Sequence, residues 1–514
     1  MQKHDWIAVL DFGSQYSQLI ARRIREQHVY SEILHFSTSA DELKQRAPAG
    51  IVLSGGPSSV LDKDAPACDS AVLELGIPVL GICYGMQLTA KLLGGAVTPG
   101  RSREYGSADI TITREEPLFT GLPKSLEVWM SHGDQVQVMP EGFESMAKTE
   151  TCPFAAMGNA ERRIFGLQFH PEVVHTPRGT DLLRKFIFDV CECTGDWQMA
   201  QFASESVEAI REQVGKDHVV CGLSGGVDSS VVAALIHKAI GNQLHCIFVD
   251  NGLLRHNEAE EVERTFADTL GLHLRVAHAQ DRFLAGLKGV VDPEEKRKII
   301  GKIFIDIFSE QARPLGEVKY LAQGTLYPDV IESHSPIGGP SATIKSHHNV
   351  GGLPDDLDFD LIEPVRELFK DEVRELGREL DLPETLVSRQ PFPGPGMAVR
   401  ILGEVTAERV ELLQQADMRL QEEIRKLDDY KNIWQSFVVL LPVQTVGVMG
   451  DSRTYENVAA LRMVQSLDGM TADWVHIPYD TLGRISNRII NEVRGINRVV
   501  YDISSKPPAT IEWE

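Results

Sequence analysis

IPVLGICYGMQL, at residues 77–88, combines an apolar strand, a turn with two glycines and the start of a helix. Similar apolar runs occur before and after it, namely IAVL, GIVLSGG and RIFGLQF. Helical patterns at residues 17–27 and 86–93 lie between several of these runs. This alternation predicts an α/β layer built on a largely parallel sheet.

A second alternating series begins with HVVCGLSGG at residues 218–226 and continues into an apolar helix at residues 227–240. Strands HCIFVD and VKYLAQG follow, and LIEPVRELFKDEVRELGREL, at residues 361–380, predicts a charged helix. The series predicts a second doubly wound, parallel-sheet domain. Within it, residues 324–354 are rich in Gly, Pro and His, and a loop of this length is typical of a lid or of disorder.

QPFPGPG, at residues 390–396, interrupts the pattern because so many Pro and Gly residues cannot continue a helix or a central strand. After it, we expect helices near residues 407–427 and 483–494. We also expect strands FVVLLP, QTVGVMG, NRVVYDI and ATIEW, with the apolar run at residues 436–450 as a buried strand. The last third therefore predicts a small α+β domain. The predicted domains are residues 1–196, 197–389 and 390–514.

The net charge of −23 argues against a broad nucleic-acid-binding surface, because binding a polyanion begins with a basic surface. Small phosphorylated ligands are still allowed, since a few backbone N–H groups can hold them. No run approaches the roughly 20 apolar residues that cross a bilayer. Seven scattered cysteines favour a reducing compartment. We expect a cytoplasmic protein with no nucleic-acid or membrane partner.

Cys83 lies between Gly81 and Gly85 where the strand turns into the helix. A nucleophile at such a turn is held clear of its neighbours, as in the nucleophile elbow of hydrolases, with Cys in place of Ser. The N-terminus of the following helix favours a thiolate there. Cys83 is therefore a candidate nucleophile, although a buried core thiol is the simpler interpretation of one cysteine taken alone.

His170 and Glu172 follow an apolar strand in FGLQFHPEVVHTP, at residues 165–177. Residues i and i+2 of an extended segment point to the same side. The carboxylate can therefore orient the imidazole, which would serve Cys83 as base and acid. A histidine in a surface loop is the alternative for His170 alone.

SGGPSS, at residues 54–59, also follows a strand and leaves backbone N–H groups bare. The N–H groups of Gly56 and Tyr84 could form an oxyanion hole for a tetrahedral intermediate. These elements resemble the class I glutamine amidotransferases, which carry G-x-C-x-G, a later His-Pro-Glu and an early Gly-Gly-Pro. The resemblance covers about residues 5–195. It implies a Cys83–His170–Glu172 triad that frees ammonia from glutamine, with glutamine contacts at Gln87 and residues 131–134.

SGGVDSS, at residues 224–230, lies between a hydrophobic strand and an apolar helix, so its N–H groups point at the space before the helix. An anion is the natural ligand there. The loop lacks the lysine of a Walker A motif, and a tight turn capped by serine is the simpler alternative. It resembles the pyrophosphate loop of the N-type ATP pyrophosphatases. That resemblance implies ATP contacts by Ser224, Gly225, Gly226, Val227, Asp228, Ser229 and Ser230.

Asp250 ends the next strand at the carboxyl edge of the sheet, where open α/β sheets bind ligands. It is a candidate ligand for Mg²⁺ or adenosine. An adenylyl transfer builds negative charge and calls for cations, for which we select Lys345 and Lys370. A lysine on an amphipathic helix is ordinarily just solvated, which is the alternative for Lys370.

The whole chain resembles the glutamine-hydrolysing GMP synthase family, including EEKRKIIG, AQGTLYPDVIES, KSHHNVGGLP, QPFPGPG, GDSRTYE and KPPATIEWE. The resemblance implies glutamine, ATP and xanthosine 5′-monophosphate (XMP) as substrates and a homodimer formed by residues 390–514. It implies XMP contacts by Arg297, Gln435, Asp451, Lys506 and Glu512. Another ammonia-channelling ligase, such as an NAD synthetase, is the nearest alternative, and a non-catalytic nucleotide sensor is a more distant one.

Overall fold

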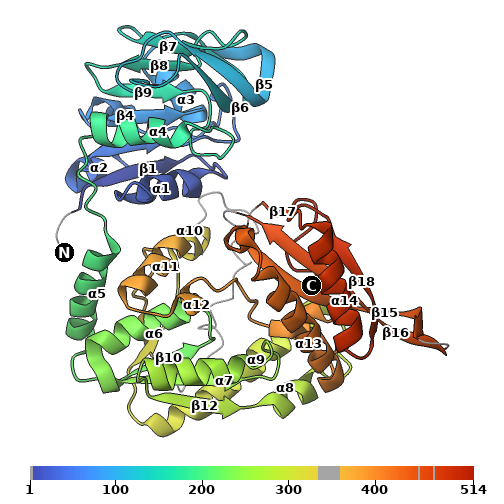
Figure 1. The fold of residues 1–514 in the computed structure, drawn as a ribbon. Helices are drawn as coiled ribbons and strands as arrows, with labels where there is room; N and C mark the ends of the chain where they lie inside the picture. Colours follow the sequence, from blue (N-terminus) through green and yellow to red (C-terminus); the bar gives the residue numbers. More distant parts are fainter. Residues whose placement is uncertain (1–3, 334–358, 450–451, 467–468, 470) are drawn as a thin grey trace. The chain divides into compact units, whose positions relative to one another are not determined.

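The computed structural model describes residues 4–333, 359–449, 452–466, 469 and 471–514. The chain divides into two compact units (Figure 1). Of the described residues, the N-terminal unit comprises 4–202 and 328–333, and the C-terminal unit comprises 203–327 and those from 359 onward. Residues 390–514 thus share a unit with the segment from residue 203 onward, and their separation as a third domain stays a prediction.

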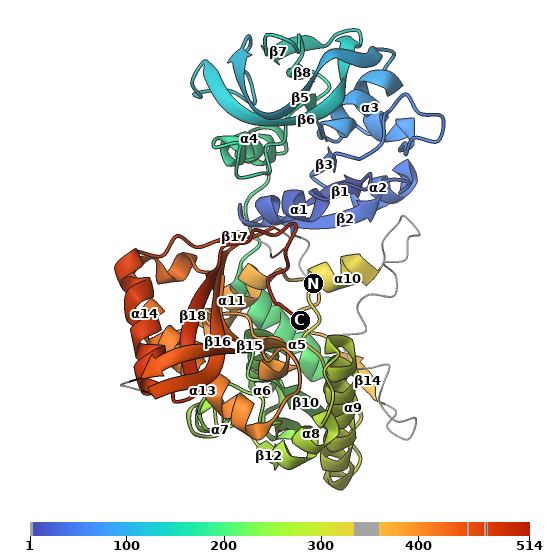
Figure 2. The same ribbon diagram turned by 90° about the vertical axis from the view of Figure 1, so that its right-hand side faces the viewer.

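The N-terminal unit is built on a nine-stranded sheet in the order β2-β1-β3-β4-β9-β8-β7-β5-β6. Strands β2, β1, β3, β4 and β9 run parallel, and the remaining pairings are antiparallel. Figure 2 shows α1 and α4 on one face of the sheet and α2 and α3 on the other. The elements are β1 (Trp6–Asp11), α1 (Ser17–Arg25), β2 (Tyr30–His35), α2 (Ala40–Arg46), β3 (Gly50–Leu53), β4 (Val79–Ile82), α3 (Tyr84–Leu92), β5 (Ala96–Ile112), β6 (Ser125–Val138), β7 (Glu144–Lys148), β8 (Ala156–Asn159), β9 (Ile164–Leu167) and α4 (Gly179–Lys185).

The parallel half confirms the predicted α/β layer. Strands β3, β4 and β9 are buried along their whole lengths, as expected of parallel strands covered by helices on both faces. Their apolar runs end at the same edge of the sheet. The turn after β4 and the segment after β9 therefore start side by side.

The C-terminal unit contains a five-stranded parallel sheet in the order β12-β11-β10-β13-β14. Strand β10 lies at its centre, paired with β11 and β13. Helix α5 (Met199–Val214) leads into it. The elements are β10 (Val219–Leu223), α6 (Val227–Ile240), β11 (Leu244–Asp250), α7 (Glu258–Glu263), β12 (Leu274–His278), α8 (Gln280–Leu287), α9 (Pro293–Ala312), β13 (Tyr320–Ala322), β14 (Asp360–Ile362), α11 (Lys370–Glu379) and α12 (Glu384–Val387). Helix α10 (Tyr327–Ser333) belongs to the N-terminal unit apart from its first residue.

A second sheet in this unit joins β15, β16 and β17 antiparallel, with β18 parallel to β16. Helices α13 and α14 pack on it through a shared apolar core. Beyond that core, the β15–β16 hairpin projects from the unit (Figure 1) and exposes Val446, Val448 and Tyr455. The elements are α13 (Ala407–Ile424), β15 (Gln435–Met449), β16 (Ser452–Gln465), β17 (Asp473–Trp474), α14 (Tyr479–Glu492) and β18 (Ile496–Asp502).

Three local predictions were wrong. The segment at residues 361–380 is not one helix, because its start completes β14 and the helix begins only at Lys370, after Pro364. The apolar run at residues 436–450 is buried only in its first half, since its second half forms the projecting hairpin. ATIEW forms no strand; its backbone carbonyls are taken up by the side chain of Arg462 instead.

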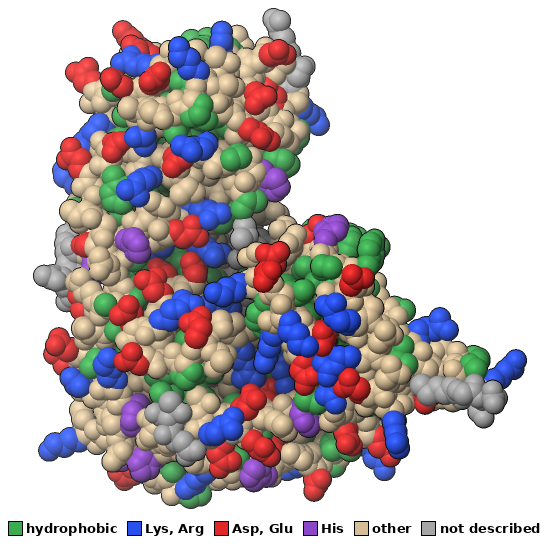
Figure 3. Space-filling view, viewed as in Figure 1, with side chains coloured by type: hydrophobic (Ala, Val, Ile, Leu, Met, Phe, Trp, Pro, Cys, Tyr) green, Lys and Arg blue, Asp and Glu red, His purple; other side chains and the backbone are tan. Residues whose placement is uncertain are grey.

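The surface carries both signs of charge. Figure 3 shows Lys and Arg side chains interspersed with Asp and Glu over both units on the face drawn. Of the helices in the described ranges, none combines the length and apolar character needed to cross a bilayer. All seven cysteines are buried and unpaired with one another.

Candidate functional site

The turn from β4 into α3 holds Cys83 in an unusual backbone conformation. Its φ of 51° lies in the left-handed region, which costs energy for any residue other than glycine. Gly85 makes the turn possible, because a Cβ added there would lie 2.3 Å from the carbonyl oxygen of Leu53. The amide of Cys83 donates to the carbonyl of Leu167 at 2.7 Å. The thiol is thereby fixed between β4 and β9.

His170 and Glu172 lie directly after β9. The Nδ1 atom of His170 donates to Oε1 of Glu172 across 2.7 Å, and Glu172 is wholly buried. The amide of His170 donates to the carbonyl of Trp129, and Thr176 Oγ1 donates to the carbonyl of His170. The imidazole is therefore held through its ring and its backbone. This contact between His170 and Glu172 is the one that their spacing predicts.

The electrostatics of His170 reflect both neighbours. Burial lowers the pKa of His170, but the charge of Glu172 and a hydrogen bond with Cys83 together raise the pKa well above its usual range. A thiol whose neighbouring imidazole is oriented by a carboxylate supplies a nucleophile, a base and an orienting group. The arrangement can perform acyl transfer to sulfur.

The glycine-rich turn after β3 lies beside this group. A Cβ on Gly55 would lie 3.3 Å from His170 Cε1, and one on Gly56 would lie 3.3 Å from Tyr84 Cγ. Gly56 thus packs against the side chain of Tyr84, the residue after the thiol. Their role as an oxyanion hole stays a prediction.

The proposed glutamine contacts also converge on the thiol. Ser131 O accepts a hydrogen bond from Cys83 Sγ at 3.7 Å, and Gln87 Nε2 donates to Asp134 O at 2.8 Å. Sequence reasoning missed Gln168, whose Nε2 lies 3.7 Å from Cys83 Sγ. Its position two residues before His170, on the same side of the strand, was the available signal.

The SHGD segment, residues 131–134, contacts Glu104, which sequence reasoning also missed. His132 Nε2 lies 3.1 Å from Glu104 Oε2, and Nδ1 donates to Asp134 O at 3.0 Å. Burial lowers the pKa of His132, and Glu104 opposes that effect. Cys152 completes a compact group with these two side chains. No sequence spacing links Glu104, His132 and Cys152.

In the C-terminal unit, SGGVDSS forms the turn from β10 into α6, and the helix spans the predicted residues. Gly225 has a φ of 72°, and Gly226 N–H donates to Ser224 Oγ at 3.3 Å. Ser229 and Ser230 both donate their hydroxyls to the carbonyl of Gly226. These bonds shape a compact loop at a helix N-terminus, where backbone N–H groups favour an anion.

Two predicted side chains lie at this loop. Lys370, the first residue of α11, bonds both carboxylate oxygens of Asp228, the second residue of α6. Asp250 is buried at the end of the neighbouring strand β11. Its Oδ1 accepts from Gly252 N–H at 3.0 Å and its Oδ2 from Gln280 Nε2 at 2.8 Å. Lys345 lies outside the described residues.

Two of the predicted acceptor contacts, Gln435 and Glu512, meet in the structure. Gln435 Nε2 donates to Glu512 Oε1 at 2.6 Å, and Arg400, which was not predicted, binds the same carboxylate through two nitrogens. Arg297 Nη2 donates instead to the main-chain oxygen of Glu514 at 2.6 Å. Lys506 Nζ donates to Gly469 O at 2.7 Å. Asp451 lies outside the described residues.

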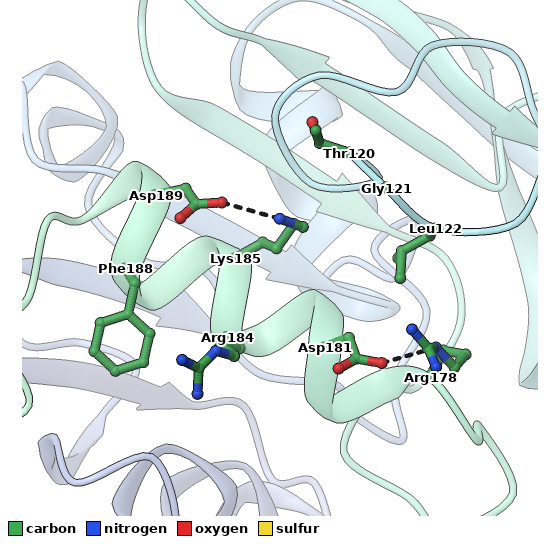
Figure 4. Close-up of a pocket in the computed structure, with 9 residues that line it drawn as sticks. All are labelled: Thr120, Gly121, Leu122, Arg178, Asp181, Arg184, Lys185, Phe188 and Asp189. Atoms are coloured by element: carbon green, nitrogen blue, oxygen red, sulfur yellow. Dashed lines mark hydrogen bonds and ion pairs between the residues drawn. The ribbon is translucent and has the colours of Figure 1, made fainter.

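A surface pocket of about 340 Å³ lies in the N-terminal unit (Figure 4), and Cys83 is not among the residues that line it. Its charged side chains come mainly from α4 and the turn that follows. Arg178 pairs with Asp181, and Lys185 pairs with Asp189. Because these cations are already neutralised by carboxylates of the same helical segment, we assign the pocket no role.

Comparison with known proteins places the Cys83 site and the phosphate loop in one family. The family model described as glutamine amidotransferase class-I matches residues 8–190, and the one described as GMP synthase C terminal domain matches residues 422–513. The chain is 57% identical over 512 residues to the GMP synthase (glutamine-hydrolyzing) of Heliobacterium modesticaldum, covering 99% of both chains. It is 58% identical over 516 residues to that of Maridesulfovibrio salexigens, covering 100% of both.

The chain belongs to the glutamine-hydrolysing GMP synthase family. A third family model, described as NAD synthase, matches residues 201–298, the segment with the phosphate loop. Only this middle segment matches that model. The amidotransferase and C-terminal matches on either side of it place the chain with the GMP synthases, in agreement with the predicted family.

Proposed function

We propose that this chain makes GMP from XMP, with glutamine as nitrogen donor and ATP as activating substrate. The observation that carries the proposal is the buried Cys83–His170–Glu172 contact in the same chain as a phosphate loop at the N-terminus of α6. One site suits thioester chemistry and the other suits a polyphosphate. Family membership supplies the acceptor.

In the glutaminase reaction, the Cys83 thiolate attacks the carboxamide carbon of glutamine. The N–H groups of Gly56 and Tyr84 hold the oxyanion that develops, and His170 gives a proton to the departing ammonia. A thioester remains on Sγ. Water, deprotonated by His170, then cleaves the thioester to glutamate and restores the thiol. Glu172 keeps the imidazole oriented through both steps.

In the synthetase reaction, the 2-oxo oxygen of XMP attacks the α-phosphorus of ATP, and pyrophosphate leaves. Ammonia then adds to C2 of the purine and AMP departs, which gives GMP. Residues 224–230 hold the β- and γ-phosphates through their N–H and hydroxyl groups. Lys370 exchanges its bond with Asp228 for the phosphates when ATP binds, since the ammonium group is already at the loop.

A magnesium ion fits this site in part. Mg²⁺ is usually held by one or two carboxylates together with substrate phosphates. Asp250 offers a carboxylate at the sheet edge. Its Oδ1 accepts from Gly252 and its Oδ2 from Gln280, and Oδ2 also lies 3.5 Å from His278 Nδ1. When bound, the ion would neutralise charge on the phosphates. Asp250 is the residue that we propose to hold it.

The acceptor nucleotide is proposed to bind in residues 390–514. Gln435 and Glu512 offer an amide and a carboxylate to the purine edge, whereas Arg297 and Lys506 offer cations to the phosphate. The exposed apolar residues of the β15–β16 hairpin support a homodimer of this domain. The seven unpaired cysteines support a cytoplasmic location.

One assay tests the proposal. The protein is incubated with glutamine, ATP, Mg²⁺ and XMP, and the products are separated. We expect glutamate, GMP, AMP and pyrophosphate in equal amounts. Release of ADP in place of AMP and pyrophosphate would refute the assignment of the phosphate loop. AMP formation only with an acceptor other than XMP would favour the alternative of another ammonia-dependent ligase.

A further inference from the structure

Arg389 lies at the end of the segment that leads into QPFPGPG, and its side chain reaches back to the phosphate loop. The Nη1 atom donates to the carbonyl oxygen of Gly225 at 2.7 Å. The Nη2 atom forms an ion pair with Glu258, whose side chain is 3% exposed. One planar guanidinium therefore joins the loop to a buried carboxylate at the start of α7.

The bond to Gly225 fixes more than one atom of the loop. In a trans peptide, the C=O and the following N–H point in opposite directions within one plane. Holding the Gly225 carbonyl on Arg389 therefore aims the Gly226 N–H away from Arg389. That N–H faces the Ser224 hydroxyl, inside the loop that is proposed to hold the phosphates. Gly225 itself is in the left-handed region, where an unheld peptide turns easily.

The next residue anchors the backbone from which Arg389 extends. Gln390 is buried, and its Oε1 accepts from both the amide and the hydroxyl of Ser436, at 3.0 and 2.7 Å. Its Nε2 donates to Ile433 O at 3.2 Å. Ser436 directly follows Gln435, one of the proposed XMP contacts. Arg389 thus binds the phosphate loop, and the next residue, Gln390, binds strand β15 beside a proposed XMP contact.

We propose that Arg389 is a positioning residue for the adenylyl transfer. It presets the Gly225–Gly226 peptide so that the Gly226 N–H meets the departing pyrophosphate. Glu258 holds the guanidinium in the plane that this contact requires. The inference rests on the proposed ATP pyrophosphatase reaction, and it adds a residue outside the SGGVDSS motif.

Three variants test the proposal: Arg389→Ala, Arg389→Lys and, as a matched control, Arg378→Ala. Arg378 pairs with Glu384 on the exposed side of α11 and touches no residue of the loop. GMP formation is measured with added ammonium chloride, so that glutamine hydrolysis is not needed. Michaelis constants are determined separately for ATP and for XMP.

Loss of one charge-assisted hydrogen bond corresponds to a fall of about 10- to 100-fold in kcat/KM for ATP in Arg389→Ala. Arg389→Lys should fall by a similar factor, because an ammonium group cannot bind Gly225 and Glu258 in one plane. The XMP affinity, read by equilibrium binding, should change by less than about threefold. Added guanidinium chloride, at millimolar concentrations, should restore part of the activity of Arg389→Ala and none of Arg389→Lys.

Activity of Arg389→Ala within twofold of Arg378→Ala would overturn the proposal. So would a loss that affects ATP and XMP equally and that guanidinium does not restore, because that pattern indicates general damage to the fold. A wild-type protein that releases no AMP and pyrophosphate would refute the proposed function instead. The two failures are therefore distinguishable.

Discussion

His170 donates a hydrogen bond from Nδ1 to Oε1 of Glu172 across 2.7 Å, at a place where Glu172 is wholly buried. The second carboxylate oxygen, Oε2, is also buried and has no hydrogen-bond partner. A buried carboxylate that serves a single donor is costly unless that donor carries positive charge. The contact therefore favours an imidazolium next to Cys83, which is the state that protonates a leaving group.

Replacing Glu172 with Gln tests this electrostatic role. The amide keeps the shape but removes the charge, which is the largest of the effects that raise the His170 pKa. We therefore expect the His170 pKa to fall in Glu172→Gln, as measured by NMR titration of the histidine ring signals. Glutamine-dependent GMP formation should fall by about 100- to 10,000-fold, the range expected when other enzymes lose the carboxylate that orients a catalytic histidine. Ammonium-dependent formation, which bypasses the thiol, should stay within twofold. An unchanged His170 pKa would contradict the account.

Gly85→Ala tests the nucleophile turn. The new Cβ would lie 2.3 Å from the backbone of Leu53, which cannot yield as a flexible side chain would. We expect destabilisation by about 1–3 kcal/mol, the range for overpacked sites, together with loss of glutaminase activity. Calorimetry of the N-terminal transition measures the first effect.

Gly301→Ala is the matched control for that substitution. Gly301 lies within α9, and a Cβ there would meet nothing within 4 Å. Alanine in a helix interior should stabilise by about 0.5–1 kcal/mol. An N-terminal transition of Gly85→Ala at the wild-type temperature would mean that the Gly85 contact is relieved by backbone movement.

Arg400→Met tests the ion pair at the proposed XMP site. Arg400 is wholly buried, binds the partly exposed Glu512 through two nitrogens and lies over the ring of Phe437. Because the substitution removes hydrogen bonds to a charged group, we expect a loss of about 1–3 kcal/mol. The exposed pair formed by Arg378 and Glu384 is the control, and Arg378→Met should cost about 0–1 kcal/mol. Chemical denaturation of both variants provides the comparison, and similar losses would refute the assigned role of burial.

Much of the fold follows from local pattern. The helix α6 spans the predicted residues 227–240 because its start is set by Gly226 and its end by Gly241, and the apolar run between them has the length of one helix. The predicted helix at residues 361–380 failed where tertiary pairing overrode periodicity. Its first residues complete the parallel sheet as β14 beside β13.

Some residues of the candidate sites could be predicted from local sequence, and others could not. Cys83 and His170 stand in recognisable motifs next to strands, so the sequence points to them directly. Arg389 and Arg400 stand in no motif of their own, and their importance comes from partners such as Gly225 and Glu512, more than 100 residues away in the chain. Only the folded structure brings those partners together.

The central claim is that Cys83 releases from glutamine the ammonia whose nitrogen enters GMP. It is tested most directly by incubating the protein with glutamine labelled with ¹⁵N in its amide, ATP, Mg²⁺ and XMP, and by measuring the mass of the GMP formed. The wild type should give GMP that carries one label. Cys83→Ala should give none from glutamine, yet make GMP from added ammonium at a rate close to that of the wild type. Labelled GMP from Cys83→Ala, or loss of both reactions in a folded protein, would contradict the account.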